Sequence, residues 1–169
     1  MPQDNTTGIW FIGARGGVAS AAALGAAALA QGLTTNAGLV STLSPFSDLD
    51  LVPWPRLVIG GHEIRTGSIA DSVTELLEQI PNTSRALVDD CRDSLDAIDA
   101  RIRPGTCVGC GPTISDMATL NGAPVTEPNA RAAIDRIADD LRQFAEEHQC
   151  RQVIVVNLAS TEPPGDVSG

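Results

Sequence analysis

The sequence predicts a doubly wound α/β fold built around a parallel sheet. Two observations predict it: short apolar runs typical of buried strands recur along the chain, and helix-like segments alternate with them. A third, the length of 169 residues with 43% hydrophobic and 19% charged side chains, suits one globular domain with a sizeable core.

The first predicted strand is the apolar run at residues 8–13, Gly-Ile-Trp-Phe-Ile-Gly. An alanine-rich helix is expected at residues 18–31, and Gly32 follows where a helix end favours a left-handed residue. Prolines break up residues 33–55, and a second strand is expected at residues 56–64. The first predicted strand thus ends at a glycine that allows a tight turn, and the second runs into Gly60 and Gly61.

The second half of the chain is predicted to be mostly helical. A short helix is expected at residues 71–80 and a longer one at 84–102, with Ser84 as its N-cap and Pro104 as its stop. The longer helix has one apolar face, formed by Leu87, Val88, Cys91, Leu95, Ile98 and Ile102. Residues 103–128 are predicted to be a loop, which at this length is usually functional or wraps a partner.

A last helix and strand complete the predicted order β-α-β-α-α-α-β. Asn129 is expected to cap a helix that runs to about His148. The β-branched run at residues 153–159 is typical of a parallel strand covered on both faces. Three strands make a small sheet with exposed edges, so we expect this chain to be an incomplete domain.

Charge and composition exclude several classes of function. The 11 basic residues are all arginine, which rules out a P-loop, a protein kinase and a Schiff-base enzyme, because each requires a lysine. A net charge of −10 argues against binding to nucleic acid or an anionic membrane. Without a signal peptide or spanning segment, a cytoplasmic location is expected. The cysteines are then expected to be thiols: Cys91, Cys107, Cys110 and Cys150.

The glycine turn at residues 13–17, Gly-Ala-Arg-Gly-Gly, has the chemistry of a dinucleotide site. Small residues let the backbone approach a pyrophosphate, and the helix that follows offers free N–H groups and a positive dipole end. Arg15 stands where such motifs usually carry a second glycine, and its guanidinium offers a contact to phosphate. The alternative is a turn that only packs a helix on a strand.

Glu63 ends the second predicted strand and is a candidate acceptor for both hydroxyls of an adenosine ribose. A carboxylate there favours NAD over NADP, although it lies further along the chain than the ~20 residues usual for this role. A solvated strand-end carboxylate is the equally weighted alternative. For Cys107 and Cys110, incidental thiols are favoured over redox or metal use, since no second pair stands at zinc-site spacing.

Three segments in order resemble the inositol-3-phosphate synthase (myo-inositol-1-phosphate synthase) family. They are Ile9-Trp-Phe-Ile-Gly-Ala-Arg-Gly-Gly-Val-Ala-Ser20, Leu57-Val-Ile-Gly-Gly-His-Glu-Ile64, and the helix at 129–148 with the strand and Thr-Glu turn that follow it. The resemblance implies a Rossmann-like NAD-binding domain. In the family, NAD serves an internal oxidation, aldol cyclisation and reduction that convert glucose 6-phosphate to inositol phosphate.

The resemblance implies a set of cofactor-binding residues. The pyrophosphate would face the turn, Glu63 would hold the adenosine ribose, and the end of the last strand would line the cofactor. The full set is Gly13, Ala14, Arg15, Gly16, Gly17, Val18, Glu63, Ala159, Ser160 and Thr161. Arg15 replaces a glycine of the family's loop, and Glu63 replaces its aspartate.

No residue here matches the lysines on which the family's catalysis and phosphate binding rely, so no catalytic residue is assigned. No metal-binding residue is assigned either. Residues 1–169 are therefore expected to be the amino-terminal part of the NAD-binding domain, without the catalytic and tetramerisation domain. This chain alone would then be inactive, whereas the full-length enzyme would be a homotetramer. Two other hypotheses stay open: a different NAD-dependent oxidoreductase, and a non-catalytic nucleotide or redox sensor that uses Cys107 and Cys110.

Overall fold

A four-stranded parallel sheet forms the centre of the computed structural model, which describes residues 6–46, 48–79, 85–120 and 127–159. The strands are β1 (Thr6–Ile12), β2 (Leu57–Glu63), β3 (Ile102–Pro104) and β4 (Cys150–Asn157), in the spatial order β3-β2-β1-β4. The direction of strand addition reverses at β1, so a topological switch point lies between β1 and β4.

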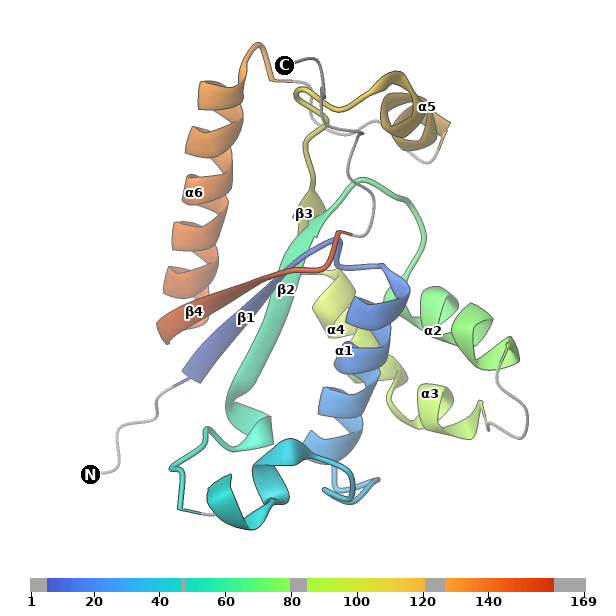
Figure 1. The fold of residues 1–169 in the computed structure, drawn as a ribbon, viewed down its shortest axis with the longest axis vertical. Coiled ribbons are helices and arrows are strands. Elements are labelled where there is room, and N and C mark those ends of the chain that lie inside the picture. Colours follow the sequence, from blue (N-terminus) through green and yellow to red (C-terminus); the bar gives the residue numbers. More distant parts are fainter. Residues whose placement is uncertain (1–5, 47, 80–84, 121–126, 160–169) are drawn as a thin grey trace.

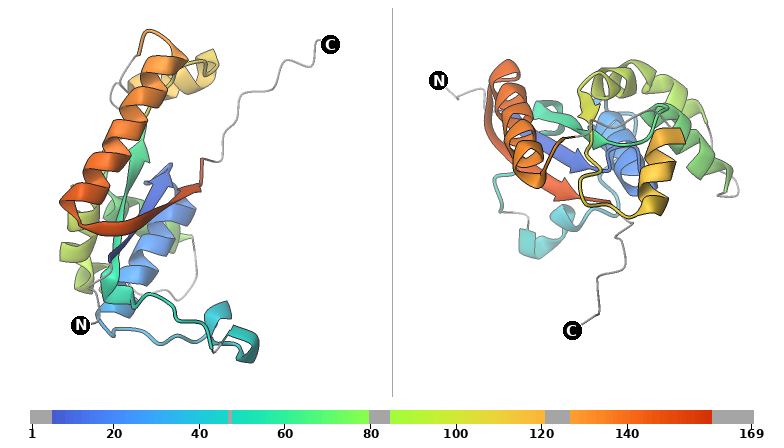
Figure 2. Two further views of the ribbon diagram at one scale, coloured as in Figure 1. Left: turned by 90° about the vertical axis from the view of Figure 1, so that its left-hand side faces the viewer. Right: turned by 90° about the horizontal axis from the view of Figure 1, so that it is seen from above.

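Helices cover both faces of the sheet (Figures 1 and 2). On one face lie α1 (Gly17–Ala30), α2 (Ile69–Glu78), α3 (Ala86–Asp90) and α4 (Arg92–Asp99), and on the other lies α6 (Ala130–Glu147). Helix α5 (Pro112–Leu120) sits beyond the carboxyl ends of the strands. Three short 3-10 helices, η1 (Val40–Thr42), η2 (Ser44–Phe46) and η3 (Trp54–Arg56), lie in the connection from α1 to β2. Within the described residues, no helix is long and apolar enough to cross a bilayer.

The main hydrophobic core lies between the sheet and α1, α2 and α4. Alanine dominates the inner side of α1, and its small side chains let the helix lie close to the strands. Gly61 in β2 permits a similar approach inside the sheet, because a Cβ there would lie 2.3 Å from the Phe11 carbonyl oxygen. Ile69 and Leu95 are fully buried in this core, whereas Trp10 and Phe144 are fully buried against each other on the side of α6.

Several sequence predictions are confirmed. The helix predicted at 18–31 is α1, and Gly32 adopts the expected left-handed conformation at φ +69°. The helix predicted at 129–148 is α6, and the Asn129 side chain caps it by accepting from the Ala132 N–H at 3.0 Å. The predicted strands at 8–13, 56–64 and 153–159 correspond to β1, β2 and β4 with shifted ends. The predicted cap Ser84 lies outside the described residues.

Two predictions in the middle of the chain are wrong. The helix predicted at 84–102 is interrupted at Cys91, whose backbone (φ −95°, ψ 3°) departs from helical geometry and separates α3 from α4. Pro104 does not follow a helix but belongs to β3, which pairs with β2 through Gly61, His62 and Glu63. The loop predicted at 103–128 therefore contains the end of β3 and all of α5.

The prediction that the last strand is covered on both faces is also wrong. Strand β4 pairs with β1 at the edge of the described sheet, and α6 packs on one side of it. Ile154 and Val155 are consequently 47% and 50% exposed. The run of β-branched residues predicts the strand correctly but cannot tell an edge strand from a central one.

Candidate functional site

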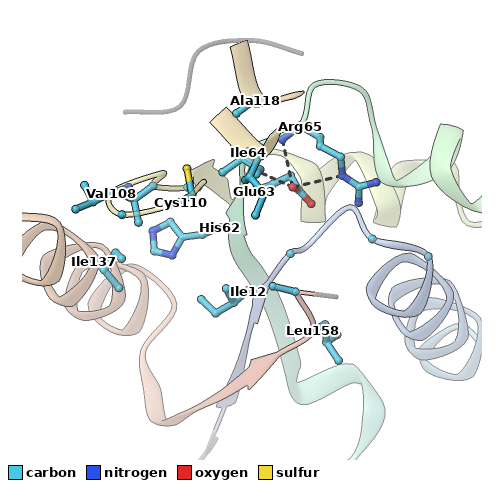
Figure 3. A pocket seen from close by; sticks show the side chains of 18 residues that line it. Ile12, His62, Glu63, Ile64, Arg65, Val108, Cys110, Ala118, Ile137 and Leu158 are labelled. Atoms are coloured by element: carbon cyan, nitrogen blue, oxygen red, sulfur yellow. Dashed lines mark hydrogen bonds and ion pairs between the residues drawn. The ribbon is translucent and has the colours of Figure 1, made fainter. Parts of the chain in front are cut away.

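A cleft of about 470 Å³ lies where the carboxyl ends of all four strands converge (Figure 3). Its floor includes Ile12 of β1, His62 and Glu63 of β2, and Leu158 just after β4. The segment after β3, from Gly105 to Cys110, forms a wall together with Ile114 of α5 and Ile137 of α6. The crevice at the switch point is where open α/β sheets bind their ligands, and its volume suits a small-molecule cofactor.

The glycine turn joins β1 to α1 at the rim of this cleft. Gly13, at φ +84°, donates its N–H to the His62 carbonyl at 2.9 Å, and the Gly16 N–H donates to the Gly13 carbonyl at 3.0 Å. A side chain on Gly13 would lie 3.2 Å from the Ala159 backbone nitrogen, so glycine also lets the ends of β1 and β4 approach each other. The turn delivers the N-terminus of α1 to the cleft without any side-chain cap. The first N–H groups of α1 therefore remain available to an anion.

Glu63 is buried at the end of β2, and its carboxylate ties the glycine turn to the strand. One carboxylate oxygen, Oε2, accepts the Arg15 N–H at 2.7 Å. The other, Oε1, accepts the N–H groups of Ile64 at 2.8 Å and Arg65 at 3.2 Å, and lies 3.5 Å from the Arg65 Nε. The Glu63 carboxylate is therefore buried and hydrogen-bonded, which contradicts the alternative of a solvated strand-end carboxylate.

The structure brings together about half of the residues expected at the cofactor. Those that line the cleft are Gly13, Gly16, Gly17, Glu63 and Ala159. Ala14 is buried behind the turn, Arg15 directs its guanidinium to Asp99 at 2.9 Å, and Val18 is 69% exposed on α1. Ser160 and Thr161 lie outside the described residues.

One side of the cleft is not predicted by the sequence. The wall at residues 105–110 and the contributions of α5 and α6 come from segments far from the glycine turn in sequence. The long predicted loop at 103–128 was the available signal, since loops of that length are usually functional. Arg65, two residues after Glu63, also lines the cleft, and its position beside the turn depends on the pairing of β1 with β2.

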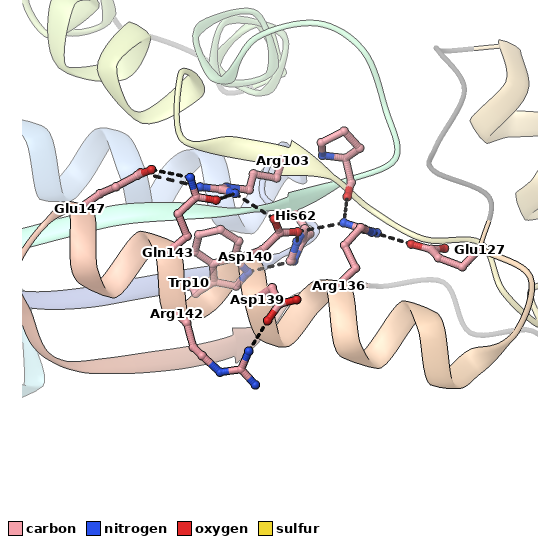
Figure 4. Close-up of polar contacts among 11 residues, drawn as sticks. Trp10, His62, Arg103, Glu127, Arg136, Asp139, Asp140, Arg142, Gln143 and Glu147 are labelled. Atoms are coloured by element: carbon pink, nitrogen blue, oxygen red, sulfur yellow. Dashed lines mark hydrogen bonds and ion pairs between the residues drawn. The ribbon is translucent and has the colours of Figure 1, made fainter.

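A chain of polar contacts runs beneath the cleft between the sheet and α6 (Figure 4). The Trp10 indole N–H donates to His62 Nδ1 at 3.0 Å, and His62 Nε2 lies 2.9 Å from Asp140. The indole can only donate, so the histidine proton is assigned to Nε2, from which it is donated to Asp140. His62 is therefore satisfied at both ring nitrogens.

Two arginines extend this network to the wall of the cleft. Arg103 and Arg136 each pair with Asp140 at 2.9 Å. Arg136 also pairs with Glu127 at 2.5 Å and donates to the carbonyl oxygens of Pro104 at 3.0 Å and Gly105 at 3.3 Å. Helix α6 thus holds the start of the wall in place through one guanidinium.

The titration of this network follows from burial and from the fixed partners. Burial lowers the pKa of His62 and outweighs the opposing effect of Asp140, so His62 is neutral near pH 7. Burial alone would raise the pKa of Asp140, but hydrogen bonds from His62 and Arg103 lower it overall. The carboxylate therefore stays ionised between two arginines.

Cys107 and Cys110 face each other across a tight turn in the wall. The Cys110 N–H donates to the Cys107 carbonyl at 3.1 Å, and Gly109 takes a positive φ of 76°. Burial and the neighbouring Cys110 raise the pKa of Cys107 to about 11, so it is a thiol at neutral pH rather than a reactive thiolate. All four cysteines are free, and the described residues contain no group of three or more His, Cys, Asp or Glu that could hold a metal ion.

Strand order, glycine turn and strand-end cleft together define a dinucleotide-binding domain of the Rossmann type. The chain belongs to the myo-inositol-1-phosphate synthase family, because the model of that family's NAD-binding domain matches residues 7–168. NAD is the cofactor for which this family domain is named. The sequence-based assignment of family, fold and cofactor is thereby confirmed.

A solved structure supports the fold. The crystal structure of inositol-3-phosphate synthase from Caenorhabditis elegans is 17% identical in sequence, with a TM-score of 0.70 over 94% of this chain. The match covers 35% of that enzyme, so this chain spans about a third of its length. Comparison with curated protein sequences gives no match.

Proposed function

We propose that this chain forms the NAD site of an inositol-3-phosphate synthase. The observation that carries the proposal is the cleft where the glycine turn, the uncapped N-terminus of α1 and the ends of β2 and β4 meet. This arrangement fits a dinucleotide: the N–H groups at the start of α1 suit the pyrophosphate, and the apolar side chains of Ile12 and Leu158 suit a ring.

Each residue that the sequence predicts at the cofactor is assigned here to one part of NAD. The backbone of the turn and of the first residues of α1 lies against the pyrophosphate, at Gly13, Ala14, Arg15, Gly16, Gly17 and Val18. Glu63 holds the adenosine ribose: its Oε2 accepts one backbone N–H, which leaves lone-pair capacity for a hydroxyl. Ala159, with Ser160 and Thr161 beyond the described residues, lines the cofactor at the end of β4.

In the complete enzyme, NAD would supply the reversible hydride acceptance that the isomerisation of glucose 6-phosphate to 1D-myo-inositol 3-phosphate requires. The residues of this chain bind and orient the cofactor and keep water from one side of it. The lysine-dependent steps belong to another part of the enzyme, because this chain contains no lysine. We place the enzyme in the cytoplasm as a homotetramer, and we expect no turnover of glucose 6-phosphate by this chain alone.

Calorimetric titration of the purified chain with NAD, up to millimolar concentration, tests the proposal. The informative variant is Gly17→Glu at the first residue of α1, where a Cβ meets nothing within 4 Å. A carboxylate there interacts favourably with the helix dipole and leaves the fold intact. It also repels a pyrophosphate, so NAD affinity should fall at least ~10-fold, as for loss of one charge-assisted contact.

Gly25→Glu is the matched control, because Gly25 lies in the same helix and its Cβ would also meet nothing within 4 Å. This variant should bind NAD as the unmodified chain does. An unmodified chain that binds no NAD would contradict the proposal. Equal affinities of the two glutamate variants would place the pyrophosphate elsewhere.

A further inference from the structure

We propose that Arg65 is the residue whose guanidinium contacts the pyrophosphate of the bound dinucleotide, and that Arg15 holds the glycine turn instead. This inference rests on the proposed NAD site and assigns its specificity for a phosphate ligand to one side chain. Both arginines lie near the turn, but their surroundings differ in a way that separates their roles.

The guanidinium of Arg15 is already engaged in the fold. Its Nε pairs with Asp99 of α4 at 2.9 Å, and its Nη1 donates to the Arg65 carbonyl at 3.1 Å. The second carboxylate oxygen of Asp99 accepts the Ile69 N–H at 2.7 Å, at the start of α2. Arg15 therefore fastens the turn to α4 and to the end of β2, and releasing it for a ligand would leave Asp99 without its cation.

Arg65 has the opposite surroundings. Its side chain is 44% exposed at the rim of the cleft, and its Nε lies 3.5 Å from Glu63, which leaves that contact long and weak. Its two Nη nitrogens donate no hydrogen bond to the residues that the structure describes. Figure 3 shows Arg65 and Glu63 side by side, next to the turn that enters α1. With respect to the described residues, the guanidinium thus lies near the cleft with its two Nη nitrogens available.

The position of Arg65 favours a contact between its guanidinium and the pyrophosphate. Its Nη2 lies 3.5 Å from the point that a Cβ on Gly16 would occupy, directly beside the uncapped start of α1. Among the described residues that line the cleft, Arg65 is the only one with a permanent positive charge. In a chain of net charge −10, an anionic ligand needs such a local cation to offset the general repulsion.

The test compares ligands that differ in their phosphates, measured by calorimetry on the unmodified chain and on Arg65→Gln. NAD and ADP both carry a pyrophosphate, adenosine carries none, and NADP adds a 2′-phosphate. Loss of one charge-assisted hydrogen bond should weaken NAD and ADP alike, by roughly 10- to 100-fold, and leave adenosine unchanged. Arg65→Lys should recover part of the loss, because it restores the charge without the planar fork.

Arg131→Gln is the matched control, since it removes another exposed guanidinium that pairs with a carboxylate, on α6 away from the cleft. Unchanged NAD affinity of Arg65→Gln would overturn the inference while the NAD site itself stands. A loss confined to NADP would assign Arg65 to the 2′-phosphate, and an equal loss with adenosine would make its role structural; either result overturns the inference. Absence of NAD binding by the unmodified chain would overturn both proposals.

Discussion

The two faces of the sheet are built on different physical principles. On the side of α1, α2 and α4, the contacts are apolar: Leu95 and Ile69 are fully buried, and alanines let α1 lie close to the strands. On the side of α6, a tryptophan, a histidine, a carboxylate and two arginines form one connected network. Helix α6 has only Ala133 and Phe144 buried.

This difference indicates a division of labour. Apolar burial contributes stability without demanding exact geometry, and it supports the turn that presents α1. A polar network contributes less net free energy but fixes positions, because each hydrogen bond has a direction. The network ends at the wall of the cleft through Arg136, so geometry is controlled where a cofactor would be enclosed.

The largest expected effect is on the apolar face. Leu95→Ala removes a side chain with no exposed surface and leaves a cavity, so the free energy of unfolding should fall by about 2–5 kcal/mol. Urea denaturation followed by circular dichroism measures it. Val40→Ala, at a side chain that is 64% exposed, is the control and should change stability by no more than about 0.5 kcal/mol. Similar losses for both variants would contradict an apolar core on this face.

An intermediate effect is expected on the polar face. Asp140→Asn keeps the shape of the side chain but deprives Arg103 and Arg136 of their shared carboxylate, so stability should fall by about 1–3 kcal/mol. The neighbouring Asp139→Asn is a matched control, since its pair with Arg142 is exposed on both sides and should contribute at most about 1 kcal/mol.

The same pair of variants tests the link from the network to the cleft. Because Arg136 holds the Pro104 and Gly105 carbonyls, loosening it through Asp140→Asn should also weaken NAD binding, whereas Asp139→Asn should not. Calorimetry on both proteins measures this. If the two variants match in stability and in NAD affinity, the polar face is not a positioning device and the comparison fails.

The sequence predicts those parts of the fold that local signals control. The strand at β1, the glycine turn and α6 with its Asn129 cap are encoded by neighbouring residues. Strand β3 carries no such signal, because three residues are too few for a period and its pairing with β2 is a tertiary contact. The exposure of Ile154 and Val155 likewise depends on the position of β4 in the sheet.

The candidate site also contains some residues that local sequence signals predict and others that depend on tertiary contacts. Gly13, Gly16 and Gly17 are predictable because a tight turn before a helix requires small residues. Glu63 is predictable from its place at a strand end, but its hydrogen bond to the Arg15 N–H depends on the pairing of β1 with β2. The contrast between Arg15 and Arg65 depends on Asp99, which α4 brings to the turn, and no local pattern carries that information.

The smallest expected effect is a pH dependence that originates on the polar face. In the folded chain, burial holds the pKa of His62 below its ordinary value of 6.5, while in the unfolded chain it is near that value. As the pH falls, the unfolded state therefore binds a proton first. The part of the free energy of unfolding that depends on a neutral His62 is fully present above pH 6.5. It is lost as the pH falls from 6.5 through the pKa of His62 in the folded chain.

A single histidine limits the slope to about 1.4 kcal/mol per pH unit, because only one proton distinguishes the two states. Urea denaturation of the native chain and of His62→Gln between pH 8 and pH 5, a window set by the histidine titration range, isolates this contribution. Glutamine can still accept from Trp10 and donate to Asp140, and the shift of His148 is present in both proteins. The native chain should lose more stability below pH 6.5 than the variant. Parallel profiles would mean that folding does not shift the pKa of His62, and a relative gain of stability by the native chain below pH 6.5 would mean that the buried imidazole is held in its charged form.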